Sequence, residues 1–180
     1  MADALALETR QKLYAEIRKS PGLHFREIQR RTSMATGALQ YHLEYLEKND
    51  LLKSEKVDNT KRYYAMRVEH LPQEEKWMPL LRQDKMRHAA LYLLTKKNAS
   101  ILQAARKLKL PYSSTAKLLD KMSDSGLLLK NKRRKEASYS IASPKEAAQL
   151  LIRYRSSFLD KLVDEFVNVW GELHQESKTI

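Results

Sequence analysis

The sequence predicts a mainly α-helical protein of the α+β class, with short β hairpins between its helices. Three observations lead to this prediction. Two closely spaced helical patterns are followed by a hairpin pattern, the same apolar pattern returns 76 residues later, and a helical period runs from Pro144 to about Gln175. The expected ranges are 1–68 for a first domain, 69–83 for a connection, 84–142 for a second domain and 143–180 for a C-terminal helix.

Residues 36–48 are predicted to form the helix around which the first domain is organised. Leu39, Leu43 and Leu46 recur at spacings of four and three and make one buried stripe. A shorter helix is expected at 25–32, so only three residues separate the two helices. Two helices joined by so short a turn form a helix-turn-helix, whose second helix can enter a DNA major groove.

A helix before this motif and a pair of strands after it complete the first domain. Residues 9–20 carry apolar side chains at helical spacing and end at Pro21-Gly22, which is a helix stop signal. Residues 51–57 and 61–66 read as two strands joined by the polar turn 58–60. Together these elements predict a winged helix domain.

The second domain is expected to repeat this plan. It would contain a helix at 84–98, a helix-turn-helix at 101–126 and a hairpin at 127–141. Aligned apolar pairs at the shift of 76 include Phe25 and Ile101, Leu43 and Leu119, and Tyr63 and Tyr139. The connection at 69–83 is too apolar for a free linker, so we expect it to pack between the domains.

The C-terminal segment is predicted to be one helix about 45 Å long. Its apolar arc is broader than one small domain can cover. We therefore expect it to pack across both domains or against the same helix of a second chain. The residues that would form a homodimer are Leu151, Phe158, Leu162, Phe166, Val169 and Leu173.

The charge of the chain points to a polyanionic partner. There are 34 Lys and Arg against 22 Asp and Glu, which gives a net charge of +12. The first repeat, 9–66, has 12 basic and 7 acidic residues, and the second, 85–142, has 14 and 3, so the excess lies in the two winged helix domains. Such an excess favours a polyanionic partner such as nucleic acid or an acidic membrane surface.

Several classes of function are disfavoured. The absence of cysteine excludes disulfides and thiolate metal sites. No apolar run approaches a membrane span, and the N-terminus lacks the pattern of a secretory signal, so we expect a cytoplasmic protein with no membrane partner. There is no glycine-rich phosphate loop and no carboxylate pair beside a histidine, so we expect no enzyme.

The run Leu39-Gln40-Tyr41-His42-Leu43, with the strand Leu51-Leu52 and the wing strand Lys61-Arg62-Tyr63-Tyr64, resembles archaeal winged helix-turn-helix transcriptional regulators of the ArsR-like kind. The resemblance covers residues 9–66. It implies sequence-specific promoter binding, commonly as dimers, with the Gln-Tyr-His-Leu helix in the major groove. Metal-sensing members use cysteine-rich or clustered histidine sites, whereas the five histidines of this chain are scattered, so no metal and no other cofactor is expected.

Candidate DNA contacts follow from these positions. In the first domain they are Thr36, Gln40 and Tyr41 for base edges or phosphates, His42 for phosphate or packing, Arg26, Arg30 and Arg31 for the backbone, and Lys61 and Arg62 on the wing. In the second they are Tyr112, Ser113, Ser114, Lys117 and Lys121, with Lys132, Arg133, Arg134 and Lys135 on the wing. The carboxylates Glu47, Asp50, Glu55 and Asp58 are expected only to solvate the surface.

The sequence thus predicts a double-stranded DNA-binding transcriptional regulator. Two alternatives remain open at this stage. Winged helices also serve as protein-docking modules with only non-specific nucleic-acid binding, and the basic second wing could bind RNA or single strands.

Overall fold

A computed structural model describes residues 7–71, 73–133 and 136–175, with the side chains of 132–136 and 171–175 left out of the description. The chain divides into two compact units, Met1–His70 and Leu71–Ile180. Each unit is described by itself below.

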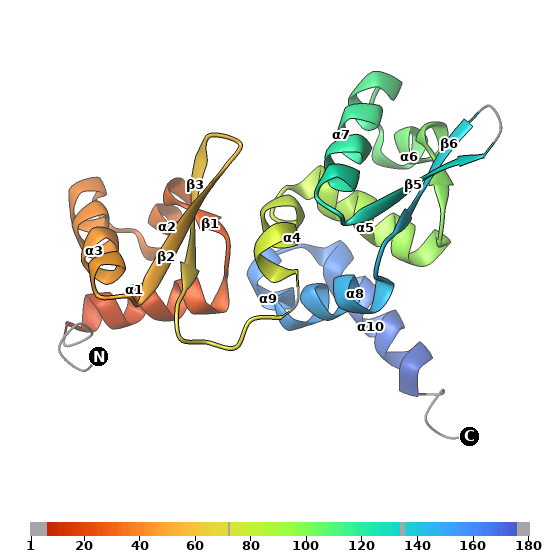
Figure 1. Ribbon diagram of the computed structural model, residues 1–180. Helices are drawn as coiled ribbons and strands as arrows, with labels where there is room; N and C mark the ends of the chain where they lie inside the picture. The colour runs from red at the N-terminus through yellow and green to blue at the C-terminus, as the bar shows by residue number, and fades with distance from the viewer. Residues whose placement is uncertain (1–6, 72, 134–135, 176–180) are drawn as a thin grey trace. The chain divides into compact units, whose positions relative to one another are not determined.

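The first unit contains the three predicted helices and two predicted strands in the predicted order, with one further short strand, β1, before the second helix (Figure 1). They are α1 (Glu8–Lys19), β1 (Leu23–His24), α2 (Phe25–Thr32), α3 (Thr36–Lys48), β2 (Leu52–Val57) and β3 (Thr60–Ala65). The strands form an antiparallel sheet in the order β1-β3-β2. Asp58 and Asn59, both at positive φ, make the two-residue turn that matches the twist of a hairpin.

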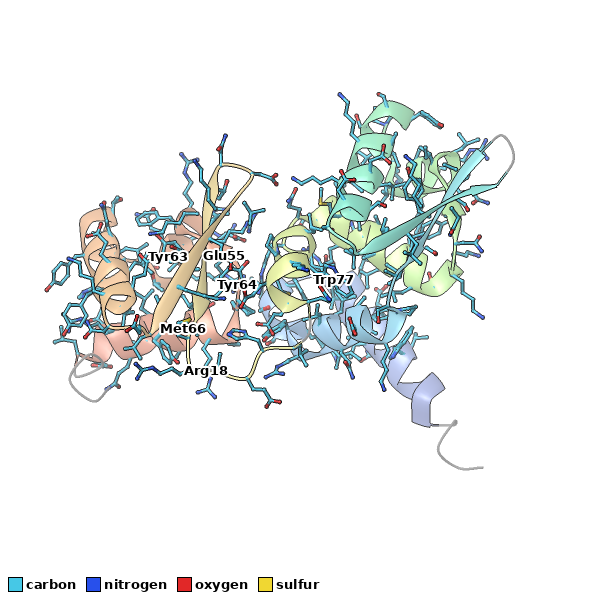
Figure 2. The ribbon with its side chains drawn as sticks, viewed as in Figure 1. Arg18, Glu55, Tyr63, Tyr64, Met66 and Trp77 are labelled. Carbon is cyan, nitrogen blue, oxygen red and sulfur yellow. The ribbon has the colours of Figure 1, made fainter. Side chains whose placement is uncertain are left out.

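The core of the first unit lies between the three helices and the sheet. The predicted leucine stripe of α3 is buried there with Leu13 and Ile17 of α1 and with Ile28 of α2. Tyr63 belongs to the same core and extends from β3 toward α3 in Figure 2. The helix positions inferred from the apolar period are therefore confirmed.

The second unit repeats these elements at a constant shift of 76 residues. Its corresponding elements are α5 (Asp84–Lys96), β4 (Ala99–Ser100), α6 (Ile101–Leu108), α7 (Tyr112–Asp124), β5 (Leu128–Arg133) and β6 (Glu136–Ile141). The sheet order β4-β6-β5 is that of the first unit. The α+β winged helix class predicted from the sequence is confirmed.

One additional helix precedes this repeat. α4 (Glu74–Leu81) lies within the range expected to be a connection. Its Trp77, Met78 and Leu81 are buried in the core of the second unit, together with residues of α5. The apolar character noticed in this range therefore reflects a helix that belongs to the second unit.

The expectation of a single long C-terminal helix is wrong. Three helices occupy this range: α8 (Pro144–Arg153), α9 (Arg155–Phe158) and α10 (Lys161–Gln175). The chain leaves the helical path at Tyr154 and again at Leu159, which has φ 54°. Because the path is broken, side chains from both sides of the broad apolar arc enter one core, where Leu151, Phe158 and Phe166 are buried.

A polar cluster fixes these last helices to α5. The Asp160 carboxylate accepts hydrogen bonds from Arg87 Nε at 2.7 Å and from the backbone N–H of Leu162 at 3.0 Å, and lies 2.9 Å from His88 Nε2. Burial raises the pKa of Asp160, but the hydrogen bonds from Arg87 and His88 outweigh it, so that its pKa lies below the ordinary value.

In the described part of the chain, no helix has the length and apolar character that a membrane crossing requires.

Candidate nucleic-acid interface

The helix-turn-helix of the first unit is fixed by local hydrogen bonds. His24 caps α2 by a capping box, in which its ring accepts from the Glu27 N–H while the Glu27 carboxylate accepts from the His24 N–H. Ser33 then turns the chain in the left-handed conformation. Gln29 Nε2 donates to Thr36 Oγ1 at 2.9 Å, which ties α2 to the first residue of α3. The candidate contact Thr36 is thus held in place by the preceding helix.

The outward face of α3 carries three of the predicted contacts. Thr36, Gln40 and Tyr41 are all exposed, and Tyr41 is 57% exposed. Gln40 Nε2 donates to Glu44 Oε1 at 3.0 Å, so a base contact by Gln40 would exchange this hydrogen bond for another. Glu44 was not among the sequence candidates, although it lies one helical turn from Gln40 on the same exposed face.

His42 lies at the edge of this face, and its side chain is packed against the protein more than it is exposed to solvent. It is half-buried, and its ring centroid is 5.2 Å from that of Tyr41. Burial, and then the charge of Arg10, lowers its pKa below the ordinary histidine value. A neutral imidazole is a poor phosphate ligand at neutral pH, so the geometry favours the packing role.

Arg10 of α1 supports the outward face of α3 from beneath. Its guanidinium carbon is 3.6 Å from the ring centroid of Tyr45 and 5.9 Å from that of Tyr41, and the residue is only 7% exposed. Sequence reasoning missed Arg10. The available signal was its place three residues before Leu13, on the buried stripe of α1.

The three arginines predicted on α2 differ in role. Arg26 and Arg30 are exposed and remain available to a phosphate backbone. Arg31 instead donates to Glu16 Oε1 and to Ser20 Oγ, each at 2.9 Å. Its side chain therefore fastens α2 to the end of α1.

A carboxylate on α3 orders the base of the first wing. Glu47 accepts from Lys61 Nζ at 2.9 Å and from Ser54, and Lys61 lies 5.1 Å from the Tyr63 ring centroid. Glu47 is therefore a link between helix and wing, and the interpretation of it as a merely solvated residue is wrong. Arg62 is buried and donates to the Gly22 carbonyl at 2.8 Å, which turns it away from the wing surface.

The second unit has a similar helix–wing link. The Asp120 carboxylate on α7 accepts from Lys130 Nζ at 2.6 Å and from the Tyr139 hydroxyl at 2.7 Å. The hydrogen bond from Lys130, and then that from Tyr139, lowers the pKa of Asp120. The hydrogen bonds of Lys130 with Asp120, and then with Tyr139, raise the pKa of Lys130. In both units, then, a carboxylate on the second helix of the helix-turn-helix holds a wing lysine.

The predicted contacts of the second unit lie at the exposed start of α7. Ser100 caps α6 by a capping box with Gln103, and Lys109 makes the left-handed turn before α7. The residues Tyr112, Ser113, Ser114 and Lys117 are exposed, Tyr112 by 58%, while Lys121 is half-buried. Short hydroxyls beside a lysine can hold a phosphate, whereas the exposed face of α3 offers an amide and a phenol.

The basic tip of the second wing is only partly within the described residues. The backbones of Lys132 and Arg133 pair with Ala137 and Glu136 at the end of β5. Their side chains, together with Arg134 and Lys135, lie outside the described residues.

The six residues predicted for a homodimer are divided between core and surface. Leu151, Phe158 and Phe166 are buried within the second unit, whereas Leu162 and Val169 are exposed by 45% and 55%. The side chain of Leu173 lies outside the described residues. A dimer surface on α10 would therefore use Leu162 and Val169, seven residues apart on one face.

Among the described side chains, no three of the types that bind metals gather closely enough to hold an ion.

The geometry agrees with what comparisons of the sequence find. Residues 7–75 match the family HTH_HVO_0163_N, N-terminal HTH domain. A curated relative, the uncharacterized HTH-type transcriptional regulator MJ1398 of Methanocaldococcus jannaschii, is 30% identical over 123 residues. That match takes in 67% of this chain but only 30% of the relative, so this chain spans less than a third of its length.

Two solved structures are also similar to this chain. The transcriptional repressor PagR of Bacillus anthracis has a TM-score of 0.39 and 24% identity, over 43% of this chain and 88% of that one. NadR in complex with 4-hydroxyphenylacetate has a TM-score of 0.38 and 13% identity, over 59% of this chain and 84% of that one.

Proposed function

We propose that this chain is a double-stranded DNA-binding transcriptional regulator that reads sequence with α3 and holds the phosphate backbone with its wings. The observation that carries the proposal is the outward face of α3, where Thr36, Gln40 and Tyr41 are exposed on a scaffold that matches an HTH domain family. An amide that can bond adenine at two positions and a phenol are suited to base edges. The HTH-type regulator from Methanocaldococcus jannaschii supports the same role.

The second domain supplies mainly affinity in this proposal. Its segment 85–142 has 14 basic and 3 acidic residues, and the start of α7 offers hydroxyls and Lys117. Contacts of this kind bind phosphate without reading sequence and make binding depend steeply on salt. A homodimer through the exposed Leu162 and Val169 of α10 is part of the proposal, and half-sites would then repeat about 34 Å apart.

The experiment is selection of bound duplexes from a random DNA library at about physiological salt, followed by competition with single-stranded DNA and RNA. A single enriched motif is the expected result. No enrichment, with duplex binding no tighter than the competitors, would favour a protein-docking module or a single-strand binder instead.

Two sets of variants separate the proposed roles. Gln40→Ala with Tyr41→Ala should remove the preference for the selected motif, because each lost base contact costs about 1–3 kcal/mol of discrimination. Replacing Lys132, Arg133, Arg134 and Lys135 by Ala should weaken all duplexes equally and flatten the salt dependence. The same uniform loss in both sets would contradict the proposed division.

A further inference from the structure

A hollow of about 270 Å³ opens on the outer face of the sheet in the second unit. The turn between α5 and β4 forms one wall, and the wing strands form the floor. In the register of β5 and β6, Asn131 lies opposite Ser138, so both side chains are on the face opposite to the buried Tyr139. The lining residues are Lys97, Asn98, Asn131, Ser138 and Ser140.

The first unit shows what fills the equivalent space there. At the shift of 76 residues, Ser138 corresponds to Arg62 and Asn98 to Gly22. The Arg62 guanidinium spans the gap between sheet and turn and donates to the Gly22 carbonyl at 2.8 Å. A serine side chain is too short to make this bridge, so the second unit has a hollow where the first has a side chain.

The charges at these positions also differ between the units, because the first unit has one carboxylate and one guanidinium there and the second has a single ammonium. Glu55, which pairs with Arg62 across the strands, is replaced by Asn131, and Pro21 is replaced by Lys97. None of the five lining residues is a carboxylate. Asn131 Nδ2 donates to Ser140 Oγ at 3.3 Å, which leaves the hydrogen of that hydroxyl to point elsewhere. The hollow is thus lined by an ammonium, two amides and two hydroxyls, a set that suits an oxyanion.

The backbone at the wall is strained. Lys97 has φ 65° and ψ −41°, and the Asn98 N–H donates to the Lys96 carbonyl at 2.8 Å. This is the γ-turn of positive φ, which is rare and unfavourable for a residue with a side chain. The first unit makes its turn with Gly22 at φ 77°, where no such cost arises. Strained residues that line a hollow are typical of ligand sites.

We propose that this hollow binds a small molecule that carries a phosphate or carboxylate group, with the oxyanion beside Lys97 and the hydroxyls of β6. The volume of about 270 Å³ leaves room beside the oxyanion for the rest of a small molecule. Such a ligand connects the turn between α5 and β4 to the wing strands, as the Arg62 side chain connects the equivalent turn and strand in the first unit. The proposal does not depend on DNA binding.

The test is an NMR titration of the full ¹⁵N-labelled chain with inorganic phosphate, acetate and phenyl phosphate, in which the backbone amide signals are monitored. Saturable shifts confined to the five lining residues and their neighbours are expected, with phenyl phosphate the tightest of the three probes. Absence of saturable shifts with all three probes would overturn the proposal.

Three variants sharpen the test. Ser138→Arg recreates the bridge of the first unit and should abolish the shifts. Lys97→Ala should weaken binding about tenfold or more, because it removes a hydrogen bond to a charged group. Lys85→Ala, an equal change of charge on the exposed start of α5, should change nothing.

The outcomes are distinguishable even if Ser138→Arg fails to fold, since Lys97 is exposed and its replacement leaves the core intact. Equal shifts in wild type and Lys97→Ala would overturn the proposal. A short DNA duplex provides the last arm. Shifts at the lining residues with the duplex but with none of the small probes would assign the hollow to the nucleic-acid backbone and would also overturn it.

Discussion

Gly37→Ala is the substitution that separates the needs of the fold from those of the proposed DNA contact. Gly37 lies in the first turn of α3 and is exposed, and a Cβ added there would meet no atom within 4 Å. Nothing in the described part of the first unit therefore requires a glycine at this position. Because glycine is a poor helix residue, alanine should raise the free energy of unfolding by about 0.5–1 kcal/mol.

The same substitution should weaken DNA binding. If the start of α3 approaches the duplex closely, as proposed, the added methyl group stands between backbone and DNA. We expect a loss of about tenfold in affinity, which corresponds to about 1.4 kcal/mol. Urea denaturation and fluorescence anisotropy with the selected duplex measure the two effects. Ala38→Gly, the converse change at the next exposed residue, is the control and should lower stability without obstructing DNA.

Two results would refute this reasoning. Higher stability with unchanged DNA affinity would mean that the start of α3 does not approach DNA. Lower stability would mean that Gly37 has a role in the fold that its open surroundings do not reveal.

Three further predictions concern the contacts around the interface and the core. Asp120→Asn should release Lys130 from α7, so hydrogen–deuterium exchange of the β5 amides should rise. The melting temperature should change little, because the Asp120–Lys130 pair is exposed. Unchanged exchange would count against the link. Asp160→Asn should destabilise the chain by about 1.5–3 kcal/mol at pH 7, because Arg87 loses one charged acceptor while it keeps its ion pair with Asp84 and its hydrogen bond to the Leu81 carbonyl. The pKa of Asp160 is lowered in the folded protein, so its contribution to stability is full above about pH 4 and is lost as pH falls through that lowered pKa. The difference in free energy of unfolding between wild type and variant, measured in urea, should therefore shrink toward about pH 3. A constant difference would contradict the stabilising role of the ionised Asp160. Arg10→Leu should lower the affinity for DNA several-fold through the loss of support under Tyr45, whereas equal affinity would show that α3 holds its face without it.

The winged helix elements could be predicted from sequence because their signals are local. The ranges 25–32 and 36–48 are α2 and α3 as the structure has them, since the buried leucines and the short turn define both ends. Because the sequence pattern repeats at a constant shift of 76 residues, the same elements could be predicted in the second unit. The C-terminal break could not be predicted in this way, because Leu159 takes a left-handed conformation without being a glycine and the apolar period continues past it.

The candidate site was only partly predictable, for a different reason. Exposure of Thr36, Gln40 and Tyr41 follows from the helical period alone. The partners of Arg31 and Arg62 are 15 and 40 residues away in the chain, so only the folded structure separates them from the exposed Arg26 and Arg30. Glu47 and Asp120 were passed over for the same reason, because their wing lysines come from another element.

The last strand of the first unit, β3, ends at Ala65, and the first helix of the second unit, α4, begins at Glu74, so only the eight residues 66–73 connect these elements. Any ligand that both units bind, once held by one, meets the other as a tethered neighbour. For short connections the effective concentration is of the order of millimolar. If both units bind phosphate, as proposed, they hold one duplex with an avidity that neither has alone. A longer connection would then reduce that avidity while leaving each unit's own affinity unchanged.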